Sequence, residues 1–134
     1  MKIKSIDNQS WIELTQNPDD DWLSFCMTVS IDLGHSVFTG SNFDLCLLNL
    51  AKFFEDFSKF ILDRQLAPKL EGTYNSYLSF GYQNGAVIIH FSLGDCFSGT
   101  IPIDYAMTGG FEIAEASLLV IEREFKILLN NQQK

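Results

Sequence analysis

The strongest periodic pattern in the chain runs from Phe43 to about Leu66. Apolar residues recur there at alternating steps of four and three, which places them on one face of a helix. This apolar face consists of Phe43, Leu47, Leu50, Phe54, Phe57 and Ile61, widened on one flank by Cys46, Phe53 and Phe60. The pattern predicts one long amphipathic helix over residues 43–66.

The other side of this predicted helix carries five charged residues, namely Lys52, Glu55, Asp56, Lys59 and Asp63. Opposite charges four residues apart can pair there, contributing about 0.2–0.5 kcal/mol per pair. Ser41 or Asn42 is suited to cap the start of the helix, and Arg64 suits the negative end of its dipole. Pro68 prevents the helix from continuing further.

Segments before this helix alternate between apolar and polar residues, which predicts β-strands. Residues 2–6 and 10–14 predict a hairpin. Residues 22–32 form the clearest strand, because apolar side chains occupy every second position. A turn at Gly34 leads into a further strand over residues 35–39.

The alternation returns after Pro68, with strands predicted over residues 69–74, 76–82 and 86–93. The last two are joined by Asn84-Gly85, a strong hairpin signal because both residues can adopt positive φ.

The region after residue 93 contains several turn residues. Gly94-Asp95-Cys96 predicts a turn, followed by a strand over residues 97–105, in which Pro102 favours an edge position or a bulge. Gly109-Gly110 predicts a loop, and residues 111–114 a short strand. The last predicted helix covers about residues 117–130, with Ser117 as its N-cap and a buried stripe of Leu118, Ile121, Phe125 and Leu128.

Tight turns join consecutive strands in this order, so the strands are expected to pair antiparallel. The fold class is therefore α+β, with an antiparallel sheet of about six to eight strands packed against one long central helix and a C-terminal helix. The length of 134 residues predicts a single domain over residues 1–134.

Composition supports a core that needs no disulfide or metal, since 46% of residues are hydrophobic and twelve are Phe. Cys26, Cys46 and Cys96 are odd in number and form no CxxC motif, which indicates reduced thiols in a cytoplasmic protein. The N-terminus has no apolar core of the kind a signal peptide needs, and no run approaches the ~18 apolar residues of a membrane span.

The net charge of −8 and pI near 4.5 argue against binding of nucleic acid or anionic membranes. The acidic balance is compatible with a basic partner, or it serves only solubility. Asp19, Asp20 and Asp21 are consecutive in a loop after Pro18. Their spacing does not match a calcium loop, so the segment is either a solvated loop or a partner contact.

Sequence motifs for common chemistry are absent. The chain contains no GxGxxG, GxxxxGK[ST] or GxSxG motif. His35 and His90 are the only histidines, and neither has a metal-ligand spacing with a cysteine or another histidine. The aromatic residues fall on core periodicities without interleaved basic residues. No cofactor or metal is expected.

Three segments follow one another in a characteristic order. The strand Trp22-Leu23-Ser24-Phe25-Cys26-Met27-Thr28-Val29 is followed by the turn region from Gly34 to Ser41 and by a segment that starts Phe43-Asp44-Leu45 and carries Leu50-Ala51-Lys52-Phe53-Phe54. This arrangement resembles the WapI-like immunity proteins of bacteria. In that family a strand ends in a G-F-x-G type turn before a helix of the form L-x-x-F-x-x-x-L. The regions 94–103 and 115–118 are also similar in layout, so that the likeness spans about residues 20–130.

The resemblance implies a non-catalytic protein that binds and neutralises the toxin domain of a polymorphic, contact-delivered toxin. Many such toxins are nucleases with basic clefts, for which acidic loops are suitable partners. This reasoning selects Asp19, Asp20, Asp21 and Asp95 as partner-binding candidates. The alternatives are a small ligand-binding or scaffold module, and an enzyme in which a histidine meets a carboxylate or Cys96. The sequence leaves the oligomeric state open.

Overall fold

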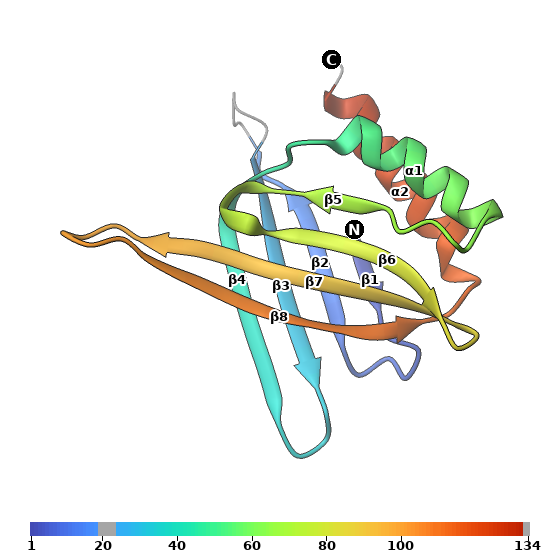
Figure 1. The fold of residues 1–134 in the computed structure, drawn as a ribbon, viewed down its shortest axis with the longest axis horizontal. Helices are drawn as coiled ribbons and strands as arrows, with labels where there is room; N and C mark the ends of the chain where they lie inside the picture. Colours follow the sequence, from blue (N-terminus) through green and yellow to red (C-terminus); the bar gives the residue numbers. More distant parts are fainter. Residues whose placement is uncertain (19–23, 133–134) are drawn as a thin grey trace.

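Two antiparallel sheets and two helices form the structure, a computed structural model that describes residues 1–18 and 24–132 (Figure 1). The first sheet has four strands in the order β1 (Lys2–Lys4), β2 (Trp11–Gln16), β3 (Ser24–Asp32) and β4 (Val37–Cys46). The second has β5 (Lys69–Glu71), β6 (Tyr77–Gln83), β7 (Ala86–Phe97) and β8 (Ile103–Ile113). Helix α1 (Leu50–Leu62) connects the sheets, α2 (Ser117–Gln132) ends the chain, and a 3-10 turn, η1 (Thr73–Asn75), precedes β6.

The α+β class is confirmed, but the prediction of one sheet of six to eight strands is wrong. Each sheet has four strands, and β4 and β5 belong to different sheets. Alternation along the chain shows where strands lie and which neighbouring strands pair. It does not show where one sheet ends and the next begins. Here α1 carries the chain from one sheet to the next.

The strands of the two sheets cross, and their apolar faces meet in one core (Figure 1). Helices α1 and α2 pack together and close one end of this core. A cluster of Phe rings fills the junction: Phe57 lies edge-on to Phe80, and Phe53 lies edge-on to Phe125, each at 4.8 Å between ring centroids.

Helix α1 is shorter than predicted, and its buried residues lie toward the predicted flank of the apolar face, with Phe54 and Ile61 only partly buried. It begins at Leu50, so the predicted start near Phe43 is wrong, as are the caps Ser41 and Asn42. The buried residues are Leu50, Phe53, Phe57 and Phe60. Phe43 is 72% exposed in β4, which bulges there so that two residues, Phe43 and Asp44, oppose Cys26. The spacing of apolar residues in this part of β4 matched that of a helix by chance.

Two of the three ion pairs expected along α1 form, and the third, Lys59–Asp63, does not. Lys52 pairs with Asp56 at 2.9 Å, and Lys59 pairs with Glu55 at 3.2 Å. The Arg64 guanidinium donates to the last-turn carbonyls of Phe60 and Ile61, as expected for a cation at a helix C-terminus.

The long hairpin of β7 and β8 differs from the sequence prediction in three places. Residues 94–96 continue β7 as far as Phe97, so the predicted turn there is wrong. The predicted strand over 97–105 is replaced by a connection at residues 98–102, which contains Pro102. The predicted loop at residues 109–110 and the short strand at 111–114 both merge into β8, whose partner throughout is β7.

The strand predicted over residues 69–74 ends at Glu71, where η1 follows, and the strand predicted over residues 35–39 is the longer β4. Other sequence expectations agree in outline with the structure. The hairpin β1–β2, the strand β3, the Asn84-Gly85 turn with positive φ at both residues, and helix α2 all form. Trp22 and Leu23, which were included in the β3 prediction, lie outside the described residues. Within residues 1–18 and 24–132, no helix has the length and apolar character needed to cross a membrane.

Candidate protein-binding surface

Charge is divided unevenly between the elements of the fold. No Lys or Arg occurs between Lys4 and Lys52, or between Lys69 and Arg123. The strands β2, β3, β4, β6, β7 and β8 therefore carry no Lys or Arg. Their charged residues are Glu13, Asp32, Asp44, Asp95, Asp104 and Glu112. The basic residues of the described chain lie on β1, α1, α2 and β5, or just beyond α1.

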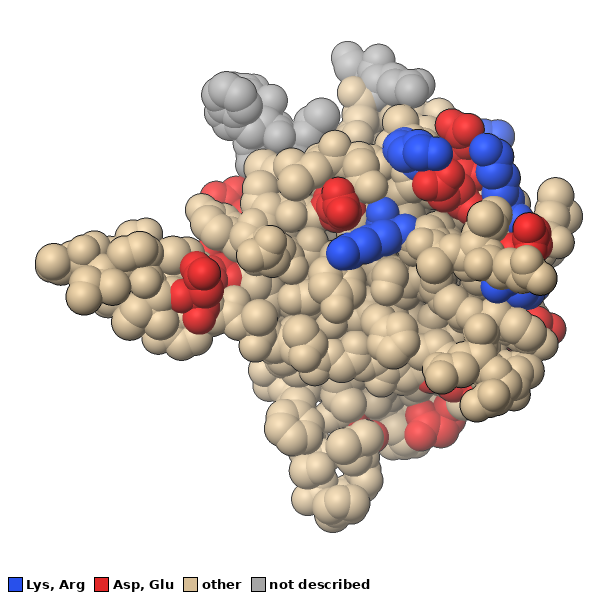
Figure 2. All heavy atoms as spheres, viewed as in Figure 1, with Lys and Arg blue, Asp and Glu red and all other residues tan. Residues whose placement is uncertain are grey.

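This division is visible on the surface. Figure 2 shows basic atoms gathered on the side where α1 lies, intermixed with acidic ones. The projecting end of the β7–β8 hairpin shows acidic atoms at its base and no basic atoms (Figure 2). The projecting β3–β4 hairpin also shows none. A partner approaching these two projections therefore meets acidic groups without neighbouring Lys or Arg.

The outer end of the β7–β8 hairpin, residues 95–105, extends beyond the body of the molecule (Figure 1). We call this segment the arm. Its side chains are exposed although several are large and apolar: Phe97 is 57% exposed, Ile103 49% and Tyr105 61%. Large apolar side chains grouped on a projection are typical of protein-interaction sites.

The pairing register shows that these side chains continue the core face. Directly opposed residues of a ladder point to the same side, and that side recurs every second residue. The pair Leu93–Met107 is followed by Asp95–Tyr105 and then by Phe97–Ile103. The inner face of the second sheet thus continues along the arm, beyond the region that the first sheet covers.

The first sheet stops covering the hairpin close to Gly40 of β4. A Cβ atom at Gly40 would lie 3.0 Å from Met107 Sδ and 3.1 Å from Leu93 Cδ2, so β4 crosses the hairpin there at close range. Beyond this crossing the inner face of β4 is also uncovered, since Phe38 is 54% exposed. Two uncovered apolar surfaces therefore diverge from the crossing of β4 with β7 and β8.

Asp95 and Asp104 supply the negative charge of the arm. Asp95 is exposed and lies on the inner face opposite Tyr105, and its Oδ1 accepts a hydrogen bond from the Cys96 backbone N–H at 2.7 Å. Asp104 is opposed to Cys96 on the outer face. Desolvation raises the pKa of the Cys96 thiol, and the Asp104 carboxylate adds to this effect, so the thiol is protonated and poorly nucleophilic at neutral pH.

Of the four predicted partner-binding residues, the structure describes one. Asp19, Asp20 and Asp21 lie outside the described residues. Asp95 lies on the arm, and its role in partner binding stays a prediction. The apolar residues of the arm were missed by sequence reasoning, because the predicted turn at residues 94–96 cut the hairpin short. Gly99 and Pro102 were the available signal for the true turn.

The histidines are not brought together with other reactive groups. His35 is exposed in the β3–β4 connection, and His90 is exposed in the middle of β7, directly between Ser79 and Gly110 in the register. Among residues 1–18 and 24–132, no three His, Cys, Asp or Glu side chains are placed to hold a metal ion. All three cysteines are free thiols.

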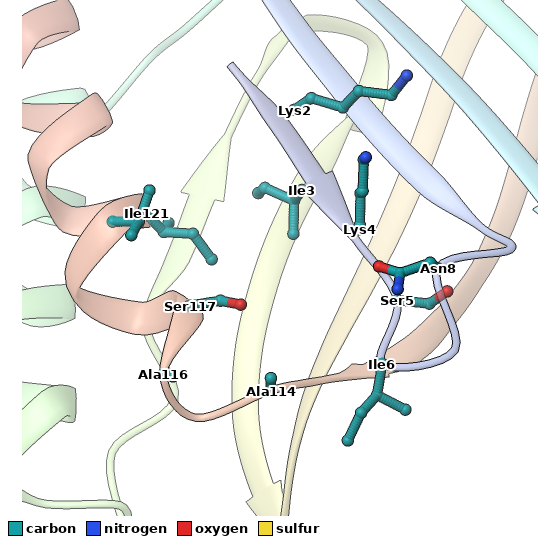
Figure 3. A pocket seen from close by; sticks show the side chains of 11 residues that line it. Lys2, Ile3, Lys4, Ser5, Ile6, Asn8, Ala114, Ala116, Ser117 and Ile121 are labelled. Carbon is teal, nitrogen blue, oxygen red and sulfur yellow. The ribbon is translucent and has the colours of Figure 1, made fainter.

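An open depression of about 450 Å³ lies between β1 and the start of α2 (Figure 3). Lys2 and Lys4 line it, but their amines point away from Ser117 (Figure 3). Lys2 instead lies over the Trp11 ring at 4.4 Å from the centroid. The depression has no aromatic lining residue and no converging polar groups, so it does not resemble a small-molecule site.

Comparisons with protein-family models, with curated proteins and with solved structures found no match to this chain. The functional argument therefore rests on the surface described above.

Proposed function

We propose that this protein is an immunity protein, which binds the toxin domain of a contact-delivered bacterial toxin and blocks it without catalysis. The observation that carries the proposal is the absence of any Lys or Arg on the six strands β2–β4 and β6–β8, combined with six acidic residues on those strands. The resemblance to WapI-like immunity proteins, itself still a prediction, points in the same direction.

Charge complementarity gives this surface a physical role. A toxin that acts on nucleic acid needs a basic cleft, and a uniformly acidic surface is attracted to such a cleft. Long-range attraction of this kind raises the rate of encounter and also lets the inhibitor compete with an anionic substrate. A nucleic acid would be repelled by the same surface.

Co-expression tests the proposal. The proposal expects a neighbouring gene to encode a secreted toxin, whose toxin domain should inhibit growth when expressed alone, and co-expression of this protein should restore growth. An unrelated acidic protein of similar size should not. In the same system the purified partners should elute together in gel filtration. Failure of both rescue and co-elution would contradict the proposal.

The electrostatic contribution to toxin binding is tested by the salt dependence of the association rate. Between about 50 mM and 500 mM salt, the association rate constant with a catalytically inactive toxin domain should fall by roughly tenfold or more, because salt screens the attraction between the two surfaces. An association rate constant that does not respond to salt would remove electrostatics from the mechanism.

A further inference from the structure

On the inner face of the arm, apolar residues continue the core face of the second sheet into solvent. Within the described residues, nothing covers Phe97, Ile103 or Tyr105, although they lie on the same face as the core residues Leu93 and Met107. A monomer gains no stability from holding such residues in a strand that projects away from its core.

We propose that this inner face is the docking surface for the toxin domain, and that it enters an apolar groove with a basic rim. The inference rests on the proposed function and specifies the contact. Phe97, Ile103 and Tyr105 fill the groove, while Asp95, on the same face beside Tyr105, meets a Lys or Arg at its rim. Aromatic side chains of this kind dominate the binding energy of protein interfaces.

Charge favours a basic partner over a second copy of this chain. A symmetric contact between two arms would bring the Asp95 carboxylates together and join two molecules that each carry a net charge of −8. The arm has no Lys or Arg to compensate for this repulsion. A basic groove, in contrast, neutralises Asp95 as it buries the apolar residues.

The apolar part is tested with a triple variant, Phe97→Gln, Ile103→Gln and Tyr105→Gln. A matched control replaces three apolar residues on the helices that are exposed to a similar or greater extent, Leu62→Gln, Leu119→Gln and Ile127→Gln, which are 90%, 60% and 49% exposed. Both variants keep the net charge. The arm variant should bind the inactive toxin domain at least about 30-fold more weakly, as expected from losing a hot spot, and should lose growth rescue. The helix variant should bind like the wild type.

The charged part is tested within the arm itself. Asp95→Asn removes a carboxylate from the inner face, and Asp104→Asn removes one from the outer face of the same arm. Each substitution removes one negative charge, so both reduce the long-range attraction to a basic partner by a similar amount. Asp95→Asn should weaken equilibrium binding by roughly 10-fold, and Asp104→Asn by less than about 3-fold.

The outcomes separate the two proposals. If the wild type neither binds nor protects, the proposed function fails, and this inference fails with it. If the wild type protects and the triple arm variant protects equally well, the docking surface lies elsewhere and this inference alone is wrong. Equal effects of the arm and helix variants, with circular dichroism showing both folded, also contradict it. Self-association of the wild type that the arm variant abolishes would assign the face to a second copy.

Discussion

At the scale of single residues, close backbone approach decides which side chains the fold accepts. Gly94 is the clearest position. Its carbonyl oxygen accepts a hydrogen bond from Asn42 Nδ2 at 2.9 Å, and its N–H donates to Ser76 Oγ at 2.9 Å. A Cβ atom at Gly94 would lie 2.1 Å from the Tyr74 carbonyl oxygen. This glycine joins both sheets to η1 and has no room for a side chain.

Gly94→Ala should lower the free energy of unfolding by more than about 2 kcal/mol, because the clash is with backbone that cannot move independently. Chemical denaturation measures the change. Gly81→Ala is the matched control, since a Cβ atom there meets nothing within 4 Å, and its effect should stay within about 0.5 kcal/mol. Equal effects at the two positions would show that the close approach at Gly94 is not formed.

The carboxylate of Asp7 gives a pH-dependent prediction. Its Oδ1 accepts hydrogen bonds from Ser5 Oγ at 2.5 Å and from the Gln9 N–H at 3.0 Å, and these bonds lower the pKa of Asp7. Because the folded-state pKa lies below the unfolded value of about 3.9, the stabilisation is complete above that pH and is lost as the pH falls through the lowered pKa.

An NMR titration of the Asp7 carboxyl carbon should therefore give a pKa below about 3.9, and Ser5→Ala should move it upward. The control Ser41→Ala removes a hydroxyl that donates instead to Thr28 Oγ1. It should leave the Asp7 titration unchanged. A pKa that does not respond to Ser5→Ala would contradict this account of the β1–β2 turn.

At the scale of elements, α1 is held by its aromatic face more than by its N-cap. Asn49 occupies the N-cap position but makes no capping hydrogen bond. Its side chain instead accepts from Glu71 N and donates to Lys69 O, which ties the start of the helix to β5. Most helical stability of this kind comes from tertiary packing of the apolar face.

Phe57→Ala should lower the free energy of unfolding by about 3–5 kcal/mol, since its fully buried ring packs against Phe53, Phe80 and Phe125. Leu62→Ala in the same helix removes a side chain that is 90% exposed and should change it by less than about 0.5 kcal/mol. Denaturant unfolding compares the two. A small effect of Phe57→Ala would mean that α1 does not close the core.

At the scale of the whole molecule, the core and the arm occupy different regions. The core lies between the sheets and under the helices, whereas the arm contributes no residue to it. The arm can therefore change without changing the core. Under the proposed function, this separation lets the contact surface vary with the partner while the core stays the same.

Shortening the arm tests this separation. Residues 96–104 are replaced by Asn-Gly, so that the opposed pair Asp95–Tyr105 is closed by a two-residue turn. The free energy of unfolding should change by less than about 1 kcal/mol, because the removed side chains are not in the core. A thermal melt with circular dichroism provides the measurement. A strongly destabilised variant would show that the arm supports the core.

The local elements of this protein followed from the order of its residues. Alternation located the hairpin β1–β2 and the strand β3, Asn84-Gly85 marked the turn between β6 and β7, and the charged positions of α1 predicted two of its ion pairs, because these depend on residues close together in the chain. Tertiary contacts were needed to set where β4 ends and α1 begins, to divide the strands into two crossing sheets, and to continue β7 and β8 into an arm. Those features depend on contacts between distant segments, such as Gly40 against Met107 and Gly94 against Tyr74, where the space left by a neighbour outweighs local preference.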